Sequence, residues 1–479
     1  MRSALVLLAL ATALATPACS TDTDTDTVGE SSDDITTGGV TAAVEAKLRV
    51  TNPSEEGKTW LTTRGNALPG SNWLMQVPVK ETWGLPFVEP GRSDDAILSE
   101  IYNVMIQAEY SLDVASLWAP TGGFLETMRE ALTELDRQNR RVVARFLFAE
   151  YPGYDPQIER TLAALTRDLR GTSVSVSVAQ HRRRVHSWNH SKIIAVDGKD
   201  AIIGGMNLKA EHYLEAEPVH DVSIHVRGPV AAASQTYVNE LWAVACNDRG
   251  AIQGNRNDQC PPAFAPREMA AEGNVRMIAV GRLGNSFRNP ADKALIAMMD
   301  ASRKSIRISQ QDLGSYRLAG AGAFPDDVLD AFTRAARRGK DVTVILTNED
   351  AYGGTSYGPG DVYANGWSLK QLWRALKARQ ESQWPSEGPA ICRHVHFAGI
   401  RMSQAPTWPS GRPLANHAKV VIIDDQAHYV GSQNLYSADL AEFGVIVDDQ
   451  PATRTFISEY WNQLSLYSLP TAYRDPGCN

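Results

Sequence analysis

A histidine and a lysine two residues apart occur twice in this chain of 479 residues, each time within the same longer pattern. The pattern reads H-x-K, four residues, Asp, six residues, and then G-[GS]-x-N. One copy runs from His190 to Asn207 and the other from His417 to Asn434, with identical internal spacing. A single H-x-K triplet would carry little information, whereas two full copies with equal spacing indicate a duplicated site.

Apolar runs and turn residues around both copies predict β-hairpins, in which side chains two residues apart point the same way. We therefore expect His190 and Lys192 to share one face, as do His417 and Lys419. Two ammonium groups suit an anion with several oxygens, and two imidazoles suit nucleophilic attack and protonation of a leaving group. A phosphodiester fits best, because histidine has a reference pKa of about 6.5 and can be neutral in one copy and protonated in the other. This chemistry needs no metal ion, and we expect no cofactor.

The remaining motif residues have narrower expected roles. Small Gly residues followed by Asn207 and Asn434 let the backbone approach a ligand closely, and the two amides can donate hydrogen bonds to its phosphate. Asp197 and Asp424 lie at turns, where a structural role is favoured over a chemical one.

The sequence between the motifs also repeats, displaced by about two hundred residues. Helix-like and strand-like segments alternate in the same order in both halves, which predicts an α/β fold with apolar strands covered by helices. The expected helices are 96–106, 294–300 and 328–339, and the expected strands are 110–118, 142–148, 305–309 and 342–346. Prolines between Cys260 and Asn274 interrupt the periodicity, so we expect the halves to be 46–265 and 266–479.

The duplicated motifs resemble the phospholipase D superfamily. Residues 187–192, 431–436 and 442–447 look like the secreted bacterial phospholipase D branch, and the resemblance extends from about Trp83 to the C-terminus. It implies two similar α/β halves with pseudo-two-fold symmetry, each a mixed sheet flanked by helices, and one active site at their interface. It also implies hydrolysis of the phosphate-headgroup ester of glycerophospholipids to phosphatidic acid and free alcohol, with transphosphatidylation to alcohols.

The same resemblance gives the histidines different roles. His190 forms a phosphohistidine, while His417 protonates the leaving alcohol and then activates water. A histidine nucleophile needs its other ring nitrogen held in one tautomer, and Asp221 and Glu442 are the candidates because each lies just before an alternating strand. Asp221 matches the branch, whereas Glu442 stands where the branch has Asp. Trp188 is expected to line the headgroup pocket beside His190, with a core position as the alternative.

The N-terminal sequence predicts export. The apolar run from Ala4 to Ala15 is too short to cross a bilayer as a mature helix and has the character of a signal-peptide core. We expect residues 1–18 to be a signal peptide and residues 19–45 to be a flexible acidic leader or lipoprotein tether. Cys19 resembles the acylation site of bacterial lipoproteins, and simple cleavage after Ala18 is the alternative. The protein is thus expected to be secreted or anchored to the cell envelope through Cys19, with no transmembrane span in the mature chain.

The other four cysteines are an even number in a chain routed to an oxidising compartment, which favours disulfides. We expect Cys246 to pair with Cys260 across a polar stretch, which leaves Cys392 to pair with Cys478. A metal cluster in the C-x-H-x-H sequence that begins at Cys392 is the alternative, but it lacks the spacing of zinc sites.

The charge distribution argues against a long nucleic acid as the main partner. Six acidic residues of the leader and the single Arg2 account for most of the net charge of −8, and the rest of the chain carries −3. A nearly neutral body lacks the strongly basic face that such a partner requires. We expect a monomer acting on phospholipid at membrane or micelle surfaces.

Three alternatives stay open. One is a phosphodiesterase of the same superfamily acting on nucleic acid or another phosphodiester. The second is a lipoprotein that binds headgroups without catalysis, which two complete motifs disfavour. The third, a cardiolipin-synthase-like activity, is disfavoured by the missing membrane spans. The Gly-rich segment 352–367 is interpreted as a loop over the lipid entrance, with an ordinary surface loop as the alternative.

Overall fold

The structure is a computed structural model. It describes residues 39–85, 94–184, 187–248, 250–266, 270–284, 289–314, 324–351, 367–385, 390–436 and 438–478. The expected signal peptide, Cys19, and residues 352–366 of the Gly-rich segment lie outside the described residues.

The first sheet is formed by residues of the N-terminal half. Its strands are β2 (Leu74–Val77), β3 (Ser111–Ser116), β4 (Val143–Ala149), β5 (Ser175–Arg184), β6 (Ser187–Trp188), β7 (Ile193–Val196), β8 (Asp200–Gly204), β9 (Asp221–Arg227) and β10 (Ile252–Gly254). The order is β10-β5-β4-β3-β7-β8-β9-β2, and β6 pairs with β5. Strands β3, β4 and β5 are parallel, whereas β7, β8, β9 and β2 are added antiparallel. The sheet is therefore mixed.

The second sheet repeats this arrangement. Its strands are β1 (Trp60–Asn66), β11 (Val275–Leu283), β12 (Ser305–Gln310), β13 (Asp341–Leu346), β14 (Val395–Gly399), β15 (Lys419–Ile423), β16 (Ala427–Gly431) and β17 (Ala441–Asp448). The order is β1-β11-β17-β16-β15-β12-β13-β14, with β12, β13 and β14 parallel and the others antiparallel. Read from β14 to β11, it has the same order and strand directions as the first sheet read from β5 to β2.

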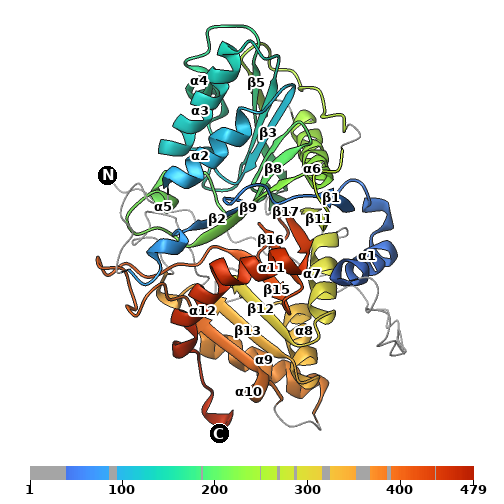
Figure 1. Cartoon of the computed structure of the whole chain (residues 1–479), viewed down its shortest axis with the longest axis vertical. Coiled ribbons are helices and arrows are strands. Elements are labelled where there is room, and N and C mark those ends of the chain that lie inside the picture. The colour runs from blue at the N-terminus through green and yellow to red at the C-terminus, as the bar shows by residue number, and fades with distance from the viewer. Residues whose placement is uncertain are drawn as a thin grey trace, which may run out of the picture.

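Helices cover the outer face of each sheet (Figure 1). A further apolar core, with residues from both sheets, lies between the sheets. The first sheet packs against α2 (Asp94–Met105), α3 (Gly122–Arg137) and α4 (Ile158–Thr166). The second packs against α1 (Gly39–Thr51), α7 (Pro290–Asp300), α8 (Asp326–Arg337) and α9 (Leu369–Gln383). Between the sheets lie α6 (Pro229–Cys246), α11 (Gln450–Phe456), a π-helical turn (Ile457–Trp461) and α12 (Asn462–Ser468); α5 (Ala210–Tyr213) and α10 (Ala390–His394) are short. The prediction of mixed sheets flanked by helices is confirmed.

Helix α8 shows why the sequence pattern identified the elements. Its buried residues recur at helical spacing, from Val328 through Phe332 to Ala336, and pack on the sheet. Acidic residues in its first turn and basic residues in its last turn complement the helix dipole. Gly339 then has a φ of +71°, a left-handed conformation that suits the residue after a helix end.

The N-terminal boundaries differ from those expected. Helix α1 begins at Gly39 and buries Val40, Val44 and Leu48, so residues 39–45 are part of the folded body and not of the leader. Strand β1 pairs with β11 and completes the sheet of the second half. The boundary between the sheets therefore does not coincide with the expected division at residue 266. The acidic composition of the leader ends before the apolar residues of α1, whose spacing of four shows where the helix starts.

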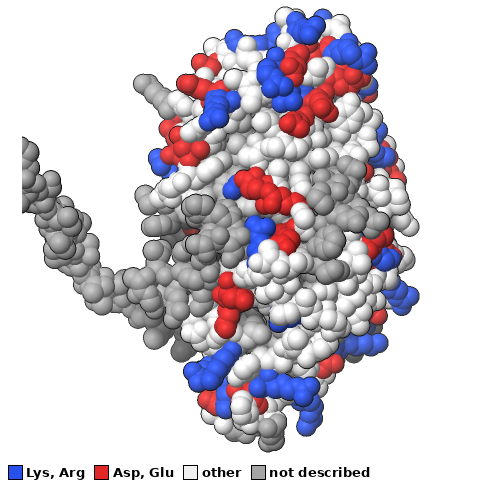
Figure 2. Space-filling model, turned by 90° about the vertical axis from the view of Figure 1, so that its left-hand side faces the viewer, with Lys and Arg blue, Asp and Glu red and all other residues white. Residues whose placement is uncertain are grey.

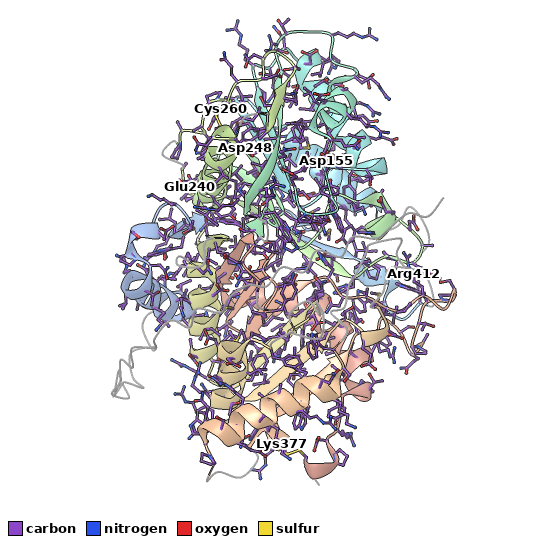
Figure 3. All side chains as sticks on the ribbon, turned by 180° about the vertical axis from the view of Figure 1, so that it is seen from behind. Asp155, Glu240, Asp248, Cys260, Lys377 and Arg412 are labelled. Atoms are coloured by element: carbon purple, nitrogen blue, oxygen red, sulfur yellow. A yellow bond between two sulfur atoms is a disulfide. The ribbon has the colours of Figure 1, made fainter. Side chains whose placement is uncertain are left out.

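Both expected disulfides, Cys246–Cys260 and Cys392–Cys478, are present. The C-x-H-x-H metal cluster is therefore wrong, because Cys392 is bonded to another cysteine. The first of these disulfides lies in the half that holds the first sheet, where Cys260 is labelled in Figure 3. Arg412, also labelled there, lies at the outer edge of the molecule. Within the described ranges, we find no helix with the length and apolar character that crossing a bilayer requires.

Candidate active site

The two motifs meet where the two sheets face each other. His190 and His417 immediately precede β7 and β15, which pair antiparallel with β8 and β16 as the predicted hairpins. The histidines lie just before these strands and not within them. The backbone N–H of His190 donates to the carbonyl of Ala441 at 2.8 Å, and the N–H of His417 donates to the carbonyl of His220 at 2.7 Å. These bonds join each motif to the opposite half, and the two imidazole centroids are 6.4 Å apart.

Each histidine is paired with a carboxylate from the other half. The Nδ1 atom of His190 is 2.9 Å from Oε2 of Glu442, and Nδ1 of His417 is 2.7 Å from Oδ2 of Asp221. All four residues are at least 95% buried. The longer glutamate side chain therefore does reach the histidine. Because Nδ1 is occupied in both rings, Nε2 is the nitrogen that faces the chemistry in each.

Two buried ammonium groups accompany the histidines. Nζ of Lys192 donates to the carbonyl of His190, and Nζ of Lys419 donates to the carbonyl of His417. Burial lowers the pKa of Lys419 to about 8, against the nearby carboxylates, and lowers the pKa of Lys192 well below its usual value. The structure thus brings both H-x-K pairs into one buried region, as expected for a site that binds an anion.

The surroundings of the His190–Glu442 pair favour a neutral imidazole beside a charged carboxylate. Burial acts to raise the pKa of Glu442, but its interactions with His190 and Arg282 lower it below its usual value. The hydroxyl of Ser432 also donates to Oε2 of Glu442 at 2.6 Å. Burial lowers the pKa of His190 to about 4 despite the carboxylate. At neutral pH the proton of the ring is therefore on Nδ1, and Nε2 carries a lone pair.

The His417–Asp221 pair is different. Burial raises the pKa of Asp221 to about 7, although Lys419 opposes the shift. Burial and Lys419 also lower the pKa of His417 well below its usual value. The hydroxyl of Tyr213 donates to Oδ2 of Asp221 at 2.8 Å and lies 3.3 Å from Nδ1 of His417. The pair as a unit therefore keeps a proton up to near neutral pH.

One difference between the two motifs matches this asymmetry. Gly205 lies beside Asp221, and a Cβ added to it would lie only 2.1 Å from Oδ1 of the carboxylate. The corresponding residue of the second motif is Ser432, which bonds to Glu442. The first motif thus needs Gly for space, whereas the second uses a hydroxyl as a donor.

The two asparagines are buried, but their surroundings differ. Neither polar atom of the Asn207 side chain has a hydrogen-bond partner within the described part of the chain. Nδ2 of Asn434 donates to the hydroxyl of Tyr436 at 2.9 Å. A buried amide without a protein partner favours a bound polar ligand. Among the described residues, no three side chains of His, Cys, Asp or Glu are grouped so that they could hold a metal ion.

The motif aspartates bind backbone at the ends of the hairpins. Asp197 accepts the backbone N–H groups of Glu109, Tyr110 and Ser111. Asp424 accepts those of Arg303, Lys304 and Ser305. Each therefore ties its hairpin turn to the segment that leads into the neighbouring strand, β3 or β12.

Trp188 lies in an aromatic cluster beside the first motif. Its ring stacks on Tyr151 at a centroid distance of 5.0 Å, and Nε1 of Trp118 donates to the Tyr151 hydroxyl at 2.7 Å. Trp188 is partly exposed and so is not a core tryptophan. This arrangement leaves it available as part of a pocket wall.

Four site residues were not predicted from the sequence. Asn189 and Asn416 precede the two histidines, and their side chains bind the ends of the neighbouring strands. Extending the repeat by one residue would have identified them, because both copies read N-H-x-K. Tyr213 and Arg282 lie outside the repeat, and no spacing in the sequence marks them.

Comparisons with known proteins agree with this geometry. Residues 295–464 match the family model described as "Cardiolipin synthase, PLD-like domain". The chain is 27% identical to a phospholipase D of Streptomyces antibioticus, with 91% of this chain and 89% of that protein covered. It is 23% identical to cardiolipin synthase A of Pseudomonas putida over 57% of this chain and 47% of that protein. The solved phosphatidylserine synthase of Haemophilus influenzae Rd KW20 has the same fold, with a TM-score of 0.55, 13% identity and coverage of 89% and 91% of the two chains.

The family match begins near α7 and includes the second motif, while the similarity to the Streptomyces enzyme extends over both motifs. Together with two equally spaced motifs that meet at one site between two similar mixed sheets, these findings show that the chain is similar to members of the phospholipase D superfamily.

Proposed function

We propose that the protein is an exported phospholipase D that hydrolyses the phosphate-headgroup ester of glycerophospholipids to phosphatidic acid and the free alcohol. The observation that carries the proposal is the crossed pair of buried dyads, His190 with Glu442 and His417 with Asp221, flanked by two buried lysines. The similarity to the Streptomyces phospholipase D over most of both chains supports a phospholipid as the substrate.

The first step uses the difference between the dyads. Nε2 of His190 attacks phosphorus with its lone pair and forms a P–N bond as the bond from phosphorus to the headgroup oxygen breaks. The proton held by the His417–Asp221 pair moves from Nε2 of His417 to that oxygen, so the headgroup leaves as a neutral alcohol. Glu442 stabilises the positive charge that develops on His190, and Lys192 and Lys419 stabilise the phosphate oxygens.

The second step reverses the roles of acid and base. A water molecule enters the space left by the headgroup, and Nε2 of His417 accepts its proton as its oxygen attacks phosphorus. The P–N bond then breaks, which releases phosphatidic acid and returns the electron pair to His190. A small alcohol can take the place of water, so the same intermediate would yield a phosphatidyl alcohol.

Several groups are placed to recognise the substrate. We propose that the buried amide of Asn207 binds a phosphate oxygen. We propose that Asn434 also binds one, by giving up its hydrogen bond to the Tyr436 hydroxyl. The partly exposed aromatic rings near Trp188 suit an apolar or cationic headgroup. A monomer suffices for this chemistry, because both dyads come from one chain.

The fate of His190 tests the mechanism directly. His417→Asn should accumulate a phosphoenzyme on His190 with a substrate whose leaving group needs no proton, while His190→Ala should not. Loss of the acid should lower turnover of natural lipids about 10²- to 10⁴-fold. The exposed His396 provides the control, because His396→Ala should leave turnover unchanged. Phosphate found on His417 in the wild type would reverse the assignment.

Product analysis separates hydrolysis from transfer. With ethanol or glycerol present, phosphatidyl alcohol should form beside phosphatidic acid while total headgroup release continues. The name of the matching family model favours a second candidate, in which a lipid hydroxyl is the preferred acceptor. Products of a mixed phospholipid extract, resolved by mass spectrometry, would show this transfer as a larger lipid formed in preference to phosphatidic acid.

A nucleic acid is the other substrate to compare. Figure 2 shows Lys and Arg mainly toward the two ends of one face, interrupted by acidic and uncharged side chains, with several acidic residues near the middle. This mixed pattern favours lipid over a long polyanion on the described part of that face. Incubation with vesicles and with plasmid DNA would decide, since cleavage of DNA without headgroup release would exclude the lipid substrate.

We also propose export, supported by the two disulfides and the signal-like N-terminal sequence. Mass spectrometry of the protein recovered from its native host should find the mature chain beginning near Cys19. A lipid on that cysteine would indicate anchoring to the envelope, and an unmodified cysteine would indicate secretion.

A further inference from the structure

Strand pairing places an arginine directly behind the nucleophile's carboxylate. Arg282 on β11 is the cross-strand partner of Glu442 on β17, and its Nη2 lies 3.6 Å from Oε1 of Glu442. The arginine is 97% buried. Its Nη1 donates to Oδ1 of Asp292 at 2.9 Å, which helps to fix the guanidinium.

The two oxygens of Glu442 have different partners. Oε2 is bonded to His190 and Ser432, whereas Oε1 has no hydrogen-bond partner among the described residues and lies 3.6 Å from Nη2 of Arg282. A buried carboxylate without a nearby cation is strongly disfavoured in its charged form. The positive charge of the arginine therefore stabilises the negative charge at Oε1, the carboxylate oxygen that is not bonded to His190.

The other dyad lacks such a group. Asp221 is bonded to His417, Tyr213 and the backbone N–H of Val222, and no arginine of the described residues forms an ion pair with it. In keeping with this, burial raises the pKa of Asp221 to about 7, whereas the pKa of Glu442 is held below its usual value. The arginine thus coincides with the chemical difference between two otherwise similar dyads.

We propose that Arg282 is a positioning residue for the nucleophile, which keeps Glu442 charged and oriented so that His190 presents its Nε2 lone pair to phosphorus. The inference rests on the proposed function in that it takes His190 as the attacking group. It adds to that function a residue outside both motifs that makes one dyad nucleophilic and leaves the other able to donate a proton.

Loss of the arginine has a defined effect on pH dependence. The charged and titratable groups that interact with Glu442 are His190, Lys192, Arg282, Lys419, Tyr237, Tyr429 and Tyr436. Removing one cation from this set lets the coupled Glu442–His190 pair take up a proton at a higher pH, and a proton gained by either group weakens the nucleophile. The acid limb of the activity profile should therefore move to higher pH in Arg282→Gln, with a lower rate of phosphoenzyme formation.

A second buried pair supplies a matched control. Arg145 on β4 is the cross-strand partner of Asp113 on β3, and the two form a bidentate ion pair that is as buried as the Arg282 pair. This pair contacts neither catalytic histidine in the structure. Arg145→Gln should lower thermal stability as Arg282→Gln does, but should leave the acid limb and the burst rate as in the wild type.

The surroundings of Arg282 also permit chemical rescue. A cavity of about 420 Å³ is lined by Arg282, Asp292, Gln433 and Tyr436, among others. Arg282→Gly would extend this cavity to Glu442, so that a free guanidinium ion could occupy the vacated position. Guanidinium chloride, far below concentrations that unfold proteins, should restore activity to Arg282→Gly, whereas urea at the same concentration should not. Arg282→Lys should restore part of the activity because it keeps a cation.

Two measurements test the role of Arg282 independently of whether the natural substrate is a lipid. A nitrophenyl phosphodiester needs no acid, so the burst of nitrophenol reports attack by His190 whether or not the natural substrate is a lipid. Isotope-labelled histidine NMR, assigned with His190→Gln, reports the tautomer and titration of His190 without any turnover. We expect Arg282→Gln to change both, and Arg145→Gln to change neither.

Opposite results would overturn the inference. If Arg282→Gln keeps the His190 titration and tautomer of the wild type and loses only stability, the arginine is purely structural. If the altered titration occurs but no lipid is cleaved by the wild type, the positioning role stands and the proposed substrate fails.

Discussion

At the scale of single residues, the two dyads predict an asymmetric pH profile. His190 must be neutral to attack, and burial lowers its pKa to about 4, so the rate should fall as the pH decreases toward that value. The His417–Asp221 pair must hold a proton to donate, and burial raises the pKa of Asp221 to about 7, so the rate should also fall as the pH rises past neutrality.

The measurement is kcat/KM for headgroup release against pH, which reports the free enzyme. With an activated nitrophenyl leaving group the alkaline limb should disappear for the first step, because no proton donor is needed, and the acid limb should remain. An alkaline limb that is equally steep with both substrates would assign it to another group, such as Lys419.

Asn189 and Asn416, which precede the two catalytic histidines, should matter for stability and turnover through their hydrogen bonds to neighbouring strands. Asn416 donates through Nδ2 to the hydroxyl of Ser309 and to the carbonyls of Gln310 and Ile345, and its Oδ1 accepts the N–H of Ala418. Asn416→Ala would remove all of these bonds, and each buried group left without another partner would cost about 1–3 kcal/mol. We expect lower thermal stability and a lower kcat with little change in KM.

Asn189 offers the comparison within the same molecule. Its Nδ2 makes a single bond to the carbonyl of Ser116, while Oδ1 is bonded to Ser191. Asn189→Ala should therefore destabilise the protein less than Asn416→Ala does. An equal loss in both variants, measured by thermal unfolding, would mean that bond number does not set the cost.

The repeat in the sequence made the motif residues predictable. It could not predict which carboxylate pairs with each histidine across the interface between the halves. Spacing within one copy identified His190 and Lys192, but it carries no information about which carboxylate from the other half approaches the ring. Arg282 becomes visible only through the register of β11 on β17, because its separation from Glu442 in the sequence is large. Long-range pairing of this kind is decided by tertiary packing and leaves no local pattern.

At the scale of elements, a buried histidine joins α2 to the first sheet. His225 on β9 lies 2.6 Å from Oε1 of Glu100 on α2 and 2.9 Å from Oδ1 of Asp200 on β8. Burial acts to lower the pKa of His225, but the two carboxylates outweigh it and raise the pKa above its usual value. The protonated imidazole thus holds two carboxylates in place.

A raised pKa in the folded state has a definite consequence for stability. The contribution of His225 is fully present below its unfolded pKa of about 6.5 and is lost as the pH rises through the folded value. The melting temperature of the wild type should therefore decline over this range, and His225→Gln should reduce the decline. His396→Gln, at an exposed position of β14, is the control. If both variants follow the wild-type curve, the network does not control stability.

Local periodicity predicted most elements, and its failures have physical causes. Strands 142–148 and 342–346 are found as β4 and β13 with nearly the predicted bounds, because continuous apolar runs suit central parallel strands. Composition placed residues 39–45, the first part of helix α1, in the leader, although the apolar spacing of this helix packs it on α7. The pairing of β1 with the second sheet is a contact between distant segments, so no local rule could place it.

At the scale of the whole molecule, the active site exists only while the two halves are docked. Both dyads cross the interface. Ser410 and Arg412 of the second half also form hydrogen bonds with Glu217 of the first. The central core adds apolar residues of both sheets around α6. Catalytic geometry is thus coupled to the stability of each half.

The two disulfides should contribute unequally to that stability. Cys392–Cys478 closes a segment with a sequence separation of 86, which includes the second motif and Glu442, whereas Cys246–Cys260 has a separation of 14 and includes no site residue. In the chain-entropy model the longer loop contributes about 4–5 kcal/mol and the shorter about 3 kcal/mol. Removing the longer link should therefore destabilise the half that supplies His417 more than removing the shorter one destabilises its partner.

Urea unfolding of the Cys392→Ser/Cys478→Ser and Cys246→Ser/Cys260→Ser double variants would measure the difference. We expect the lower midpoint in the first pair, with headgroup release lost at the same urea concentration as the structure, because the crossed dyads cannot survive loss of either half. Both variants should keep the wild-type pH profile in the absence of urea. A lower midpoint in the second pair would show that loop length does not govern stability here, and that contacts of the Cys246–Cys260 loop with the first half matter more.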